Sequence, residues 1–343
     1  AIDGDTGNHE VVSYDTMSTA NWSRTTDHYD SSWNKTSQHV ELDSGFHLVH
    51  TYDVYGRQAW SNDSINYDPT WRRLDQTIRW DDGRSQLNQW DPGAQQTWAS
   101  VTSNYDNLGR MTDQTITWDN GSIQNNYWDI FGQVDWTSAT NNLDAYSRLL
   151  SQVLNYDNGS HAVGEWDVYG QHAWSWYSNK YDANWRLNDQ LIVNDSGEYT
   201  STQFDVYGHH GWSDVTHTYD SANRLINRTI NQDDGQHEIA YWDFNNVNSW
   251  SVLNYKYNSA WQLTSQTIDF DNGNHEVTQW DVYNQAEWSV ITDRYDSSWQ
   301  RYEHTGNFDR GGSFHHTWDI YNQDPEMMSM LRFYFWDGNI EKT

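Results

Sequence analysis

The chain places many carboxylates beside aromatic rings, and three kinds of chemistry could use that combination. Acidic pairs such as Asp81-Asp82 and Asp233-Asp234 could act as the acid and base of a glycoside hydrolase. Stacked carboxylates could bind calcium, which takes oxygen ligands. Aromatic rings beside Asp, Asn and Gln could bind sugars, because a sugar stacks on a ring face and hydrogen-bonds to polar neighbours. The spacing of these residues decides among the three.

The acidic residues belong to a repeat. An aromatic residue followed by Asp recurs with a constant 38-residue period, without insertion or deletion; these Asp residues are Asp15, Asp53, Asp91, Asp129, Asp167, Asp205, Asp243, Asp281 and Asp319. Surface loops tolerate insertions, so a constant period implies that each copy packs on the next. An active site is a unique place, whereas these residues recur, and no phosphate-loop, nucleophile-elbow or zinc-protease motif is present. We therefore expect no enzymatic activity.

Tryptophan follows the same period. Counting positions from the repeat Asp as position 0, Trp stands at position 7 in eight copies: Trp22, Trp60, Trp98, Trp136, Trp174, Trp212, Trp250 and Trp288. Aromatic side chains bury large areas. These residues are expected to form structural ladders in which each Trp stacks on its copy one repeat away, and they are also the rings that a sugar would contact.

Three turns punctuate the repeat. Position 3 is often Gly or Asn, which tolerate positive φ, and the position 0 Asp can accept backbone N–H groups of that turn. This role is preferred over calcium binding, and calcium is the one cofactor candidate. A second turn contains a Gly eight residues before each repeat Asp, namely Gly7, Gly45, Gly83, Gly121, Gly159, Gly197, Gly235, Gly273 and Gly311. A third turn follows a second Asp at position 15.

The third turn is the least clear of the three. Its fourth residue is a Trp in five copies: Trp33, Trp71, Trp185, Trp261 and Trp299. Trp is a poor choice for positive φ, so we expect a different geometry there. Five His residues lie two after the turn Gly (His9, His47, His161, His237 and His275), but they do not form a metal-ligand set.

Between the turns lie short runs rich in Thr, Val, Ile, Tyr and Trp, such as residues 76–80 and 114–118. This composition is typical of strands, and no stretch has helical periodicity. The mean hydropathy of −1.02 excludes a conventional aliphatic core, while 23 Trp and 23 Tyr argue against disorder. The sequence predicts an all-β repeat array.

Two segments resemble a known repeat. Tyr105-Asp106-Asn107-Leu108-Gly109-Arg110 and Tyr181-Asp182-Ala183-Asn184-Trp185-Arg186-Leu187 are each followed by an Asp-x-Gly turn and another aromatic-Asp pair. They are similar to YD repeats of the RHS type. The resemblance implies a wound antiparallel β-sheet on a secreted or surface-exposed protein. Here the repeat adds a segment containing the position 7 Trp, and the toxin-cage function of some members is not carried over.

Two other architectures stay open. Three hairpin turns in each repeat would reverse the chain direction in successive copies, so that identical residues would have unlike neighbours. A three-sided parallel β-solenoid avoids this reversal, with the turns as corners and coils about 4.8 Å apart. A β-propeller with four short strands in each blade is the third candidate.

The array is expected to cover residues 1–324 and to be followed by a degenerate segment, residues 325–343. That segment contains Met330, Leu331, Phe333, Phe335 and Trp336. It is either a hydrophobic cap folded onto the last coil or a strand that pairs with another subunit. Open pairing of the second kind produces filaments.

Composition restricts the partners. A net charge of −30 argues against nucleic acid and anionic membranes, and no apolar run is long enough to insert into a membrane. We expect a non-enzymatic extracellular or cell-surface structural protein, a fibre, filament or adhesin-stalk subunit that associates end to end. The alternative is a multivalent lectin-like protein that binds glycans. Solvent-facing Trp rows would favour the lectin, and buried Trp would favour the scaffold.

Overall fold

A computed structural model of the chain describes residues 2–3, 7–320, 329–334 and 340–342. The chain divides into two compact units, residues 1–169 and residues 170–343. The described residues form strands and turns and contain no helix, and hence none that could cross a membrane.

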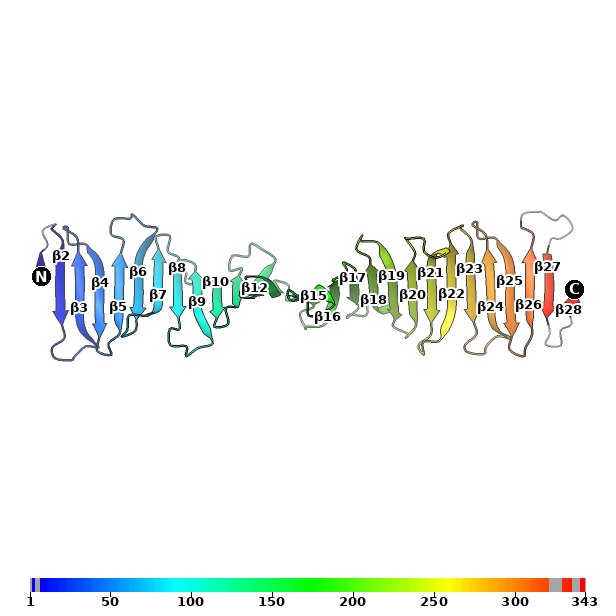
Figure 1. The fold of residues 1–343 in the computed structure, drawn as a ribbon, viewed down its shortest axis with the longest axis horizontal. Coiled ribbons are helices and arrows are strands. Elements are labelled where there is room, and N and C mark those ends of the chain that lie inside the picture. Colours follow the sequence, from blue (N-terminus) through cyan, green and yellow to red (C-terminus); the bar gives the residue numbers. More distant parts are fainter. Residues whose placement is uncertain (1, 4–6, 321–328, 335–339, 343) are drawn as a thin grey trace. The chain divides into compact units, whose positions relative to one another are not determined.

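In the first unit each strand pairs antiparallel with the next along the chain (Figure 1). The strands are β1 (Ile2–Asp3), β2 (His9–Tyr14), β3 (Trp22–Tyr29), β4 (Lys35–Leu42), β5 (His47–Tyr52), β6 (Trp60–Tyr67), β7 (Arg73–Trp80), β8 (Ser85–Trp90), β9 (Trp98–Tyr105), β10 (Met111–Trp118), β11 (Ile123–Trp128), β12 (Trp136–Leu143), β13 (Leu149–Tyr156) and β14 (His161–Trp166).

The second unit is built in the same way, again with antiparallel pairs of consecutive strands. The strands are β15 (Trp174–Tyr181), β16 (Leu187–Asn194), β17 (Tyr199–Phe204), β18 (Trp212–Tyr219), β19 (Leu225–Gln232), β20 (His237–Trp242), β21 (Trp250–Tyr257), β22 (Leu263–Phe270), β23 (His275–Trp280), β24 (Trp288–Tyr295), β25 (Arg301–Phe308), β26 (Ser313–Trp318), β27 (Ser329–Tyr334) and β28 (Ile340–Lys342).

Each repeat contributes three strands, of eight, eight and six residues, as in β6, β7 and β8. Within each unit the pairing continues from one repeat to the next, as between β8 and β9. The predicted all-β antiparallel sheet is therefore confirmed. The parallel solenoid is wrong because the described pairs are antiparallel, and the propeller is wrong because a blade would end where β8 instead pairs with β9.

Three strands are an odd number, so the chain direction does reverse in each successive repeat. A rotation that reverses the strand direction but keeps the order of the strands along the row must also exchange the two faces of the sheet. Within each unit, each repeat is therefore related to the next by an approximate two-fold screw along the row of strands, combined with the strand twist, and the strand direction is restored only after two repeats. In each unit, the residues that one repeat places on one face and one edge are placed by the next repeat on the opposite face and edge.

This symmetry overturns the expected Trp ladder. Trp22 begins β3 and Trp60 begins β6, three strands away and running in the opposite direction. Three strand spacings are about 14 Å. The position 7 Trp instead lies opposite position 27 of the adjacent strand, as Trp60 lies opposite Trp80 and Trp98 opposite Trp118.

The described residues of the two units do not form a hydrophobic core. The buried apolar side chains among the described residues are small: Val101, Ala139, Ala162, Val215 and Ala240. Strand residues are mostly half-buried on both faces. A single-layer sheet with two wet faces explains how a chain of such low hydropathy can fold, because cross-strand pairs rather than a core stabilise it.

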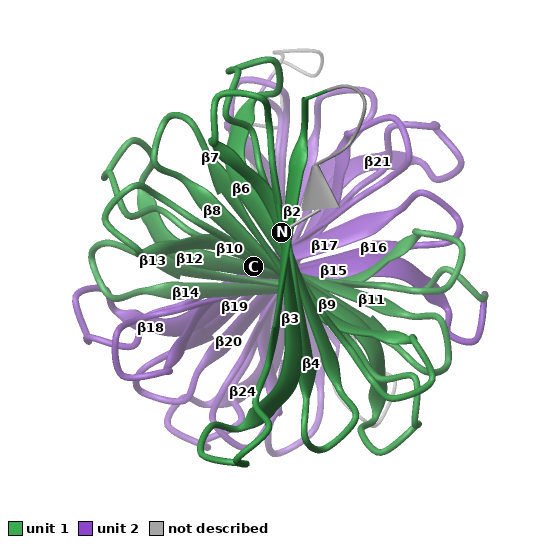
Figure 2. Cartoon of the chain, turned by 90° about the vertical axis from the view of Figure 1, so that its left-hand side faces the viewer, with its two compact units in different colours: residues 1–169 green, residues 170–343 purple. Residues whose placement is uncertain are grey.

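Polar cross-strand contacts follow the repeat. Thr102 Oγ1 donates to Asn88 Oδ1 at 2.9 Å, and Gln76 Nε2 donates to both carboxylate oxygens of Asp63. The same Thr-to-Asn bond recurs one repeat later between Thr140 and Asn126, at 3.0 Å. Successive strands are also rotated, so the green strands of the first unit fan out in an end-on view (Figure 2).

The expected C-terminal segment contains a strand that continues the second meander. Strand β27 pairs with β26. Ser329 lies opposite Trp318, eleven residues before it, whereas Val290 in the preceding copy lies opposite Trp280, ten residues before it. One extra residue moves the side chains of β27 to the face opposite that of their counterparts. Met330, Leu331 and Phe333 are half-buried, and Phe335 and Trp336 lie outside the described residues. The boundary at residue 324 stays a prediction.

Candidate functional site

The position 0 Asp caps the long turn that precedes each position 7 Trp. Its Oδ2 atom accepts the backbone N–H five residues later, at 2.6 Å from Gln58 to Asp53 and 2.8 Å from Val134 to Asp129. The same bond is made by Asp15, Asp91, Asp205, Asp243 and Asp281. These backbone donors lower the pKa of Asp15, Asp205, Asp243 and Asp281.

Position 3 of this turn has positive φ in eight copies, as expected: Ser18, Gly56, Ala94, Gly132, Gly170, Gly208, Asn246 and Asn284, with φ from 49° to 64°. Asp167 begins a turn of this kind, at Gly170, and the turn after Asp319 lies outside the described residues from residue 321 on. In the described part of the chain no three His, Cys, Asp or Glu side chains group as a metal site would require. The turn carboxylates accept N–H groups there, and calcium binding stays a proposal.

The second turn needs Gly for two reasons. The Gly residues of this turn have φ from 78° to 89°. A Cβ atom on Gly83 would also lie 3.0 Å from Asn107 Cβ, and one on Gly235 only 2.9 Å from Ser259 Cβ. This turn therefore packs directly against the third turn of the next repeat.

The third turn is built around its buried Asp. Asp182, 4% exposed, accepts the backbone N–H groups of Asn184 and Arg186 at 2.8 and 2.9 Å on Oδ1. Arg186 Nε donates to Oδ2 at 2.7 Å, and Tyr207 Oη donates to the same atom at 3.0 Å. Burial alone would raise the pKa of Asp182, but these donors outweigh it and lower the pKa to about 2.

Arg186 and Tyr207 also join this turn to the long turn of the next repeat. Arg186 Nη1 donates to the Val206 carbonyl at 3.0 Å, and its guanidinium lies 4.6 Å from the centre of the Tyr207 ring. Arg148 makes the same contacts with Val168 and Tyr169. The long turn contacts the second turn in its own repeat, through bonds such as Asp81 N to Ala59 O at 3.1 Å.

All three turn types therefore follow one another in contact along each edge of a unit. The sequence along an edge is long turn, second turn, then third turn of the following repeat. An inserted residue in any turn would displace a contact with the turn beside it. This arrangement gives the physical reason for the constant 38-residue period.

The Trp residues of the third turn contradict the expected geometry. Trp33, Trp71, Trp185, Trp261 and Trp299 have φ from 58° to 64°. Such a conformation costs about 1–3 kcal/mol for a non-Gly residue. Each indole for which a stack is described lies on a His ring: His9 on Trp33, His47 on Trp71, His237 on Trp261 and His275 on Trp299, with centroids 3.8 to 3.9 Å apart. A stacked aromatic pair returns about 0.5–1.5 kcal/mol.

The repeats themselves carry a signal for this pairing that the sequence interpretation missed. His at the first position of the six-residue strand occurs where the following third turn has Trp, including His161 with Trp185. Where the third turn has Gly109, Ser147 or Asn223, the strand begins with Ser85, Ile123 or Tyr199. The first residue of the six-residue strand and the fourth residue of the next third turn therefore change together from copy to copy, although they are far apart in the sequence.

Exposure divides the Trp residues into two classes. The position 7 Trp residues are half-buried in all eight copies. The third-turn Trp residues are 52–55% exposed. Solvent-facing Trp rows were expected in a lectin, and buried Trp in a scaffold. The half-buried position 7 Trp residues therefore favour the scaffold, whereas the third-turn Trp residues are accessible to a ligand.

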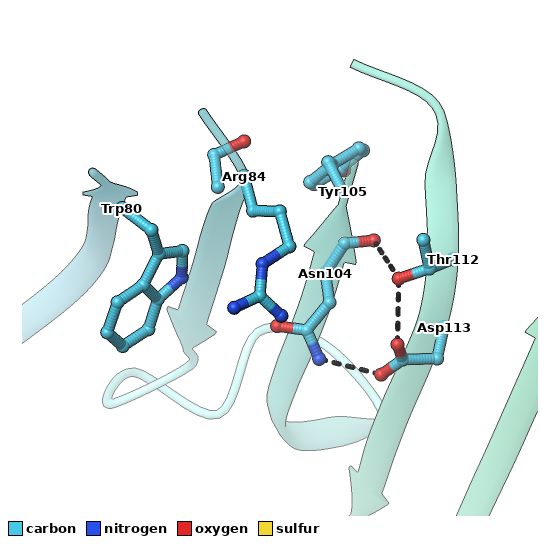
Figure 3. A pocket seen from close by; sticks show the side chains of 7 residues that line it. Trp80, Arg84, Asn104, Tyr105, Thr112 and Asp113 are labelled. Carbon is cyan, nitrogen blue, oxygen red and sulfur yellow. Dashed lines mark hydrogen bonds between the residues drawn. The ribbon is translucent and has the colours of Figure 1, made fainter. Parts of the chain in front are cut away.

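One place in the first unit does not repeat. Figure 3 shows a pocket of about 270 Å³ on one face of the sheet, lined by Trp80, Arg84, Ser85, Asn104, Tyr105, Thr112 and Asp113. Asn104 Nδ2 donates to Asp113 Oδ1 at 2.6 Å, and Thr112 Oγ1 donates to Asp113 Oδ2 at 2.8 Å. Arg84 stands between Trp80 and Asn104 (Figure 3), and its Nε donates to Asp82 Oδ2 at 2.8 Å.

Neighbouring copies lack this combination. One repeat earlier the corresponding residues are Leu42, Phe46, Asn66 and Asp75, and one repeat later they are Trp118, Ser122, Asn142 and Ser151. The Asn-to-Asp bond recurs between Asn66 and Asp75, at 2.7 Å. Only the copy at Trp80 combines the indole, the guanidinium, the amide and the carboxylate.

No protein-family model matches the chain, and no curated protein matches it. Among solved structures it is similar to a TcdB2–TccC3 structure without the hypervariable C-terminal region, with 9% identity over 92% of this chain and 23% of that one, and a TM-score of 0.17. A second TcdB2–TccC3 structure gives 9% identity, 94% and 24% coverage and a TM-score of 0.18. A structure described as the eukaryotic initiation factor gives 8% identity, 88% and 86% coverage and 0.17. The chain spans about a quarter of the TcdB2–TccC3 chains. Scores this low carry no argument about fold or function.

Proposed function

We propose that this tandem-repeat β-protein is a non-enzymatic extracellular structural protein, a fibre or adhesin-stalk subunit. The observation that carries the proposal is the unbroken row of turn contacts along both edges of each unit. It lets a sheet without a core be lengthened by whole repeats. Each repeat adds three strands, about 14 Å along the row. The resemblance to YD repeats, whose members are secreted or surface-exposed, supports the proposed location.

End-to-end association through the terminal segment is part of this proposal. Its support is that residues 329–334 pair as strand β27 in the meander. A meander ends in edge strands whose backbone groups can pair with another chain. Among the described residues that edge strand is β28, which pairs with β27, and Met330, Leu331 and Phe333 are the apolar side chains of β27 beside it.

Negative-stain electron microscopy of the purified chain tests the proposal. The full chain is expected to form filaments, and a chain lacking residues 325–343 is expected to lose them. The control deletes residues 54–91, one whole repeat, and leaves both ends unchanged; it should still form filaments. Discrete particles without filaments in all three samples would contradict end-to-end assembly.

Multivalent glycan binding is the second candidate. The observation in its favour is the exposure of the third-turn indoles, 52–55%. The test is a glycan array with the wild-type chain and with a variant that carries Gly at the five third-turn Trp positions, as the chain does at Gly109. Binding that is lost in the variant would support this function, and equal binding by both proteins would contradict it.

A further inference from the structure

We propose that the pocket beside Trp80 binds one neutral pyranose ring. This goes beyond the structural role, and it differs from multivalent binding because the site occurs once. The volume of about 270 Å³ is smaller than that of pockets that hold drug-sized ligands, and it suits a single sugar ring.

The indole of Trp80 provides the apolar wall. The side chain is half-buried at the end of β7, where Trp60 lies opposite it on β6. The C–H face of a pyranose stacks on such a ring, in the way that apolar faces pack on aromatic surfaces. Across the pocket from Trp80, the side chains of Asn104 and Asp113 rise from β9 and β10 (Figure 3).

Both hydrogen-bond donors and acceptors line the rest of the pocket. Each oxygen of Asp113 accepts one bond from the protein, from Asn104 or from Thr112, and each retains a further acceptor site. Arg84 also lines the pocket; it uses its Nε for Asp82, and its two terminal nitrogens are further donors. Vicinal hydroxyl groups both donate and accept, so a sugar edge can bond to the carboxylate and the guanidinium together.

Charge selects a neutral sugar over an acidic one. The lining carries one carboxylate, Asp113, and one guanidinium, Arg84, whose charge is already paired with Asp82, and the whole chain carries −30. A carboxylated sugar would therefore be repelled by Asp113 and by the net negative charge of the chain, whereas a neutral sugar would not.

Neighbouring copies supply variants that the fold already accepts. Trp80→Leu, Arg84→Ser and Asp113→Ser introduce the residues found at the same repeat positions as Leu42, Ser122 and Ser151. Binding of methyl β-glucopyranoside, methyl β-galactopyranoside and methyl α-mannopyranoside is measured by saturation-transfer NMR and calorimetry. At least one of the three should bind the wild-type chain, and each variant should weaken that binding by about tenfold or more.

A gain-of-function variant completes the test. The next copy already contains Trp118 and Asn142 in the corresponding places, so Ser122→Arg with Ser151→Asp should create a second site and raise the stoichiometry from one to two. Failure of all three pyranosides to bind at millimolar concentration would overturn the proposal. So would unchanged binding by the three single variants, or tighter binding of methyl glucuronide than of any neutral sugar. Filament formation is scored separately and tests only the structural function.

Discussion

At the scale of the residue, the residue type at a turn position depends on the side chain that it contacts. Asp182 is held as a carboxylate by four donors, and Trp71 tolerates positive φ where it can stack on His47. Asn258 takes the place of the buried Asp in one copy, and there Gln262 replaces the Arg and accepts a bond from the amide. The His and Trp positions therefore change together, whereas the third-turn Asp is kept where Asn34 or Gln300 replaces the Arg.

The His–Trp stack is expected to be a coupled pair. His47→Ser and Trp71→Gly, the combination found at Ser85 and Gly109, should show a coupling free energy of about 0.5–1.5 kcal/mol in a double-mutant cycle. Urea denaturation of the wild type, the two single variants and the double variant measures it. Additive single effects would show that the stack does not offset the strained turn.

The third-turn carboxylates are expected to make stability fall in acid. The pKa of Asp182 is about 2 in the folded protein, below the value near 3.9 of an unfolded chain. Its contribution is thus fully present above about pH 4 and is lost as the pH falls toward 2. Asp182→Asn with Arg186→Gln copies the Asn258–Gln262 set and should make the decline of the urea midpoint between pH 4 and 2 shallower. Identical pH profiles for the two proteins would contradict this assignment.

At the scale of the element, the turns rather than the strands set the register. The Gly and Asn positions of the first two turns could be predicted from the sequence, because positive φ favours those residues whatever surrounds them. The third turn could not, because its cost is offset by a His ring that the preceding repeat supplies. Only a comparison of copies within the chain reveals that dependence. The pocket was also missed, since Trp80, Asn104 and Asp113 meet from three strands and each varies between copies.

Two Gly residues that both have positive φ are expected to differ in the cost of substitution by Ala, because only one of them contacts a neighbouring turn. Gly208 has no atom near its missing Cβ, and Ala94 occupies the same turn position with φ 49°. Gly208→Ala should therefore cost only the strain of the backbone conformation, about 1–3 kcal/mol. Gly235→Ala should cost about 1–3 kcal/mol more, because its Cβ would lie 2.9 Å from Ser259 Cβ.

Adding Ser259→Gly to Gly235→Ala should recover the clash part of that cost and leave the cost of the backbone conformation. Thermal and urea unfolding of the four proteins measures the difference. Equal costs at Gly208 and Gly235 would show that the turns do not restrain one another.

At the scale of the whole molecule, the odd number of strands in the repeat decides the architecture. The sequence indicated three turns in each repeat, and the reversal that follows was an argument for the parallel solenoid. The chain direction does reverse in each repeat, and identical residues still have equivalent surroundings because a single-layer sheet has two equivalent faces and two equivalent edges. Composition agrees with this result, because a sheet without a buried side needs few aliphatic residues.

Engineered disulfides test the alternating meander most directly, because the chain has no Cys of its own. Asn88 and Thr102 lie opposite each other on β8 and β9, so a Cys pair at these positions should oxidise readily. Thr77 and Thr115 are one whole repeat and three strands apart, about 14 Å, too far for a disulfide. Mass spectrometry after mild oxidation should find the first bridge and not the second. The second bridge in place of the first would show that identical positions stack on one another, and it would contradict the account.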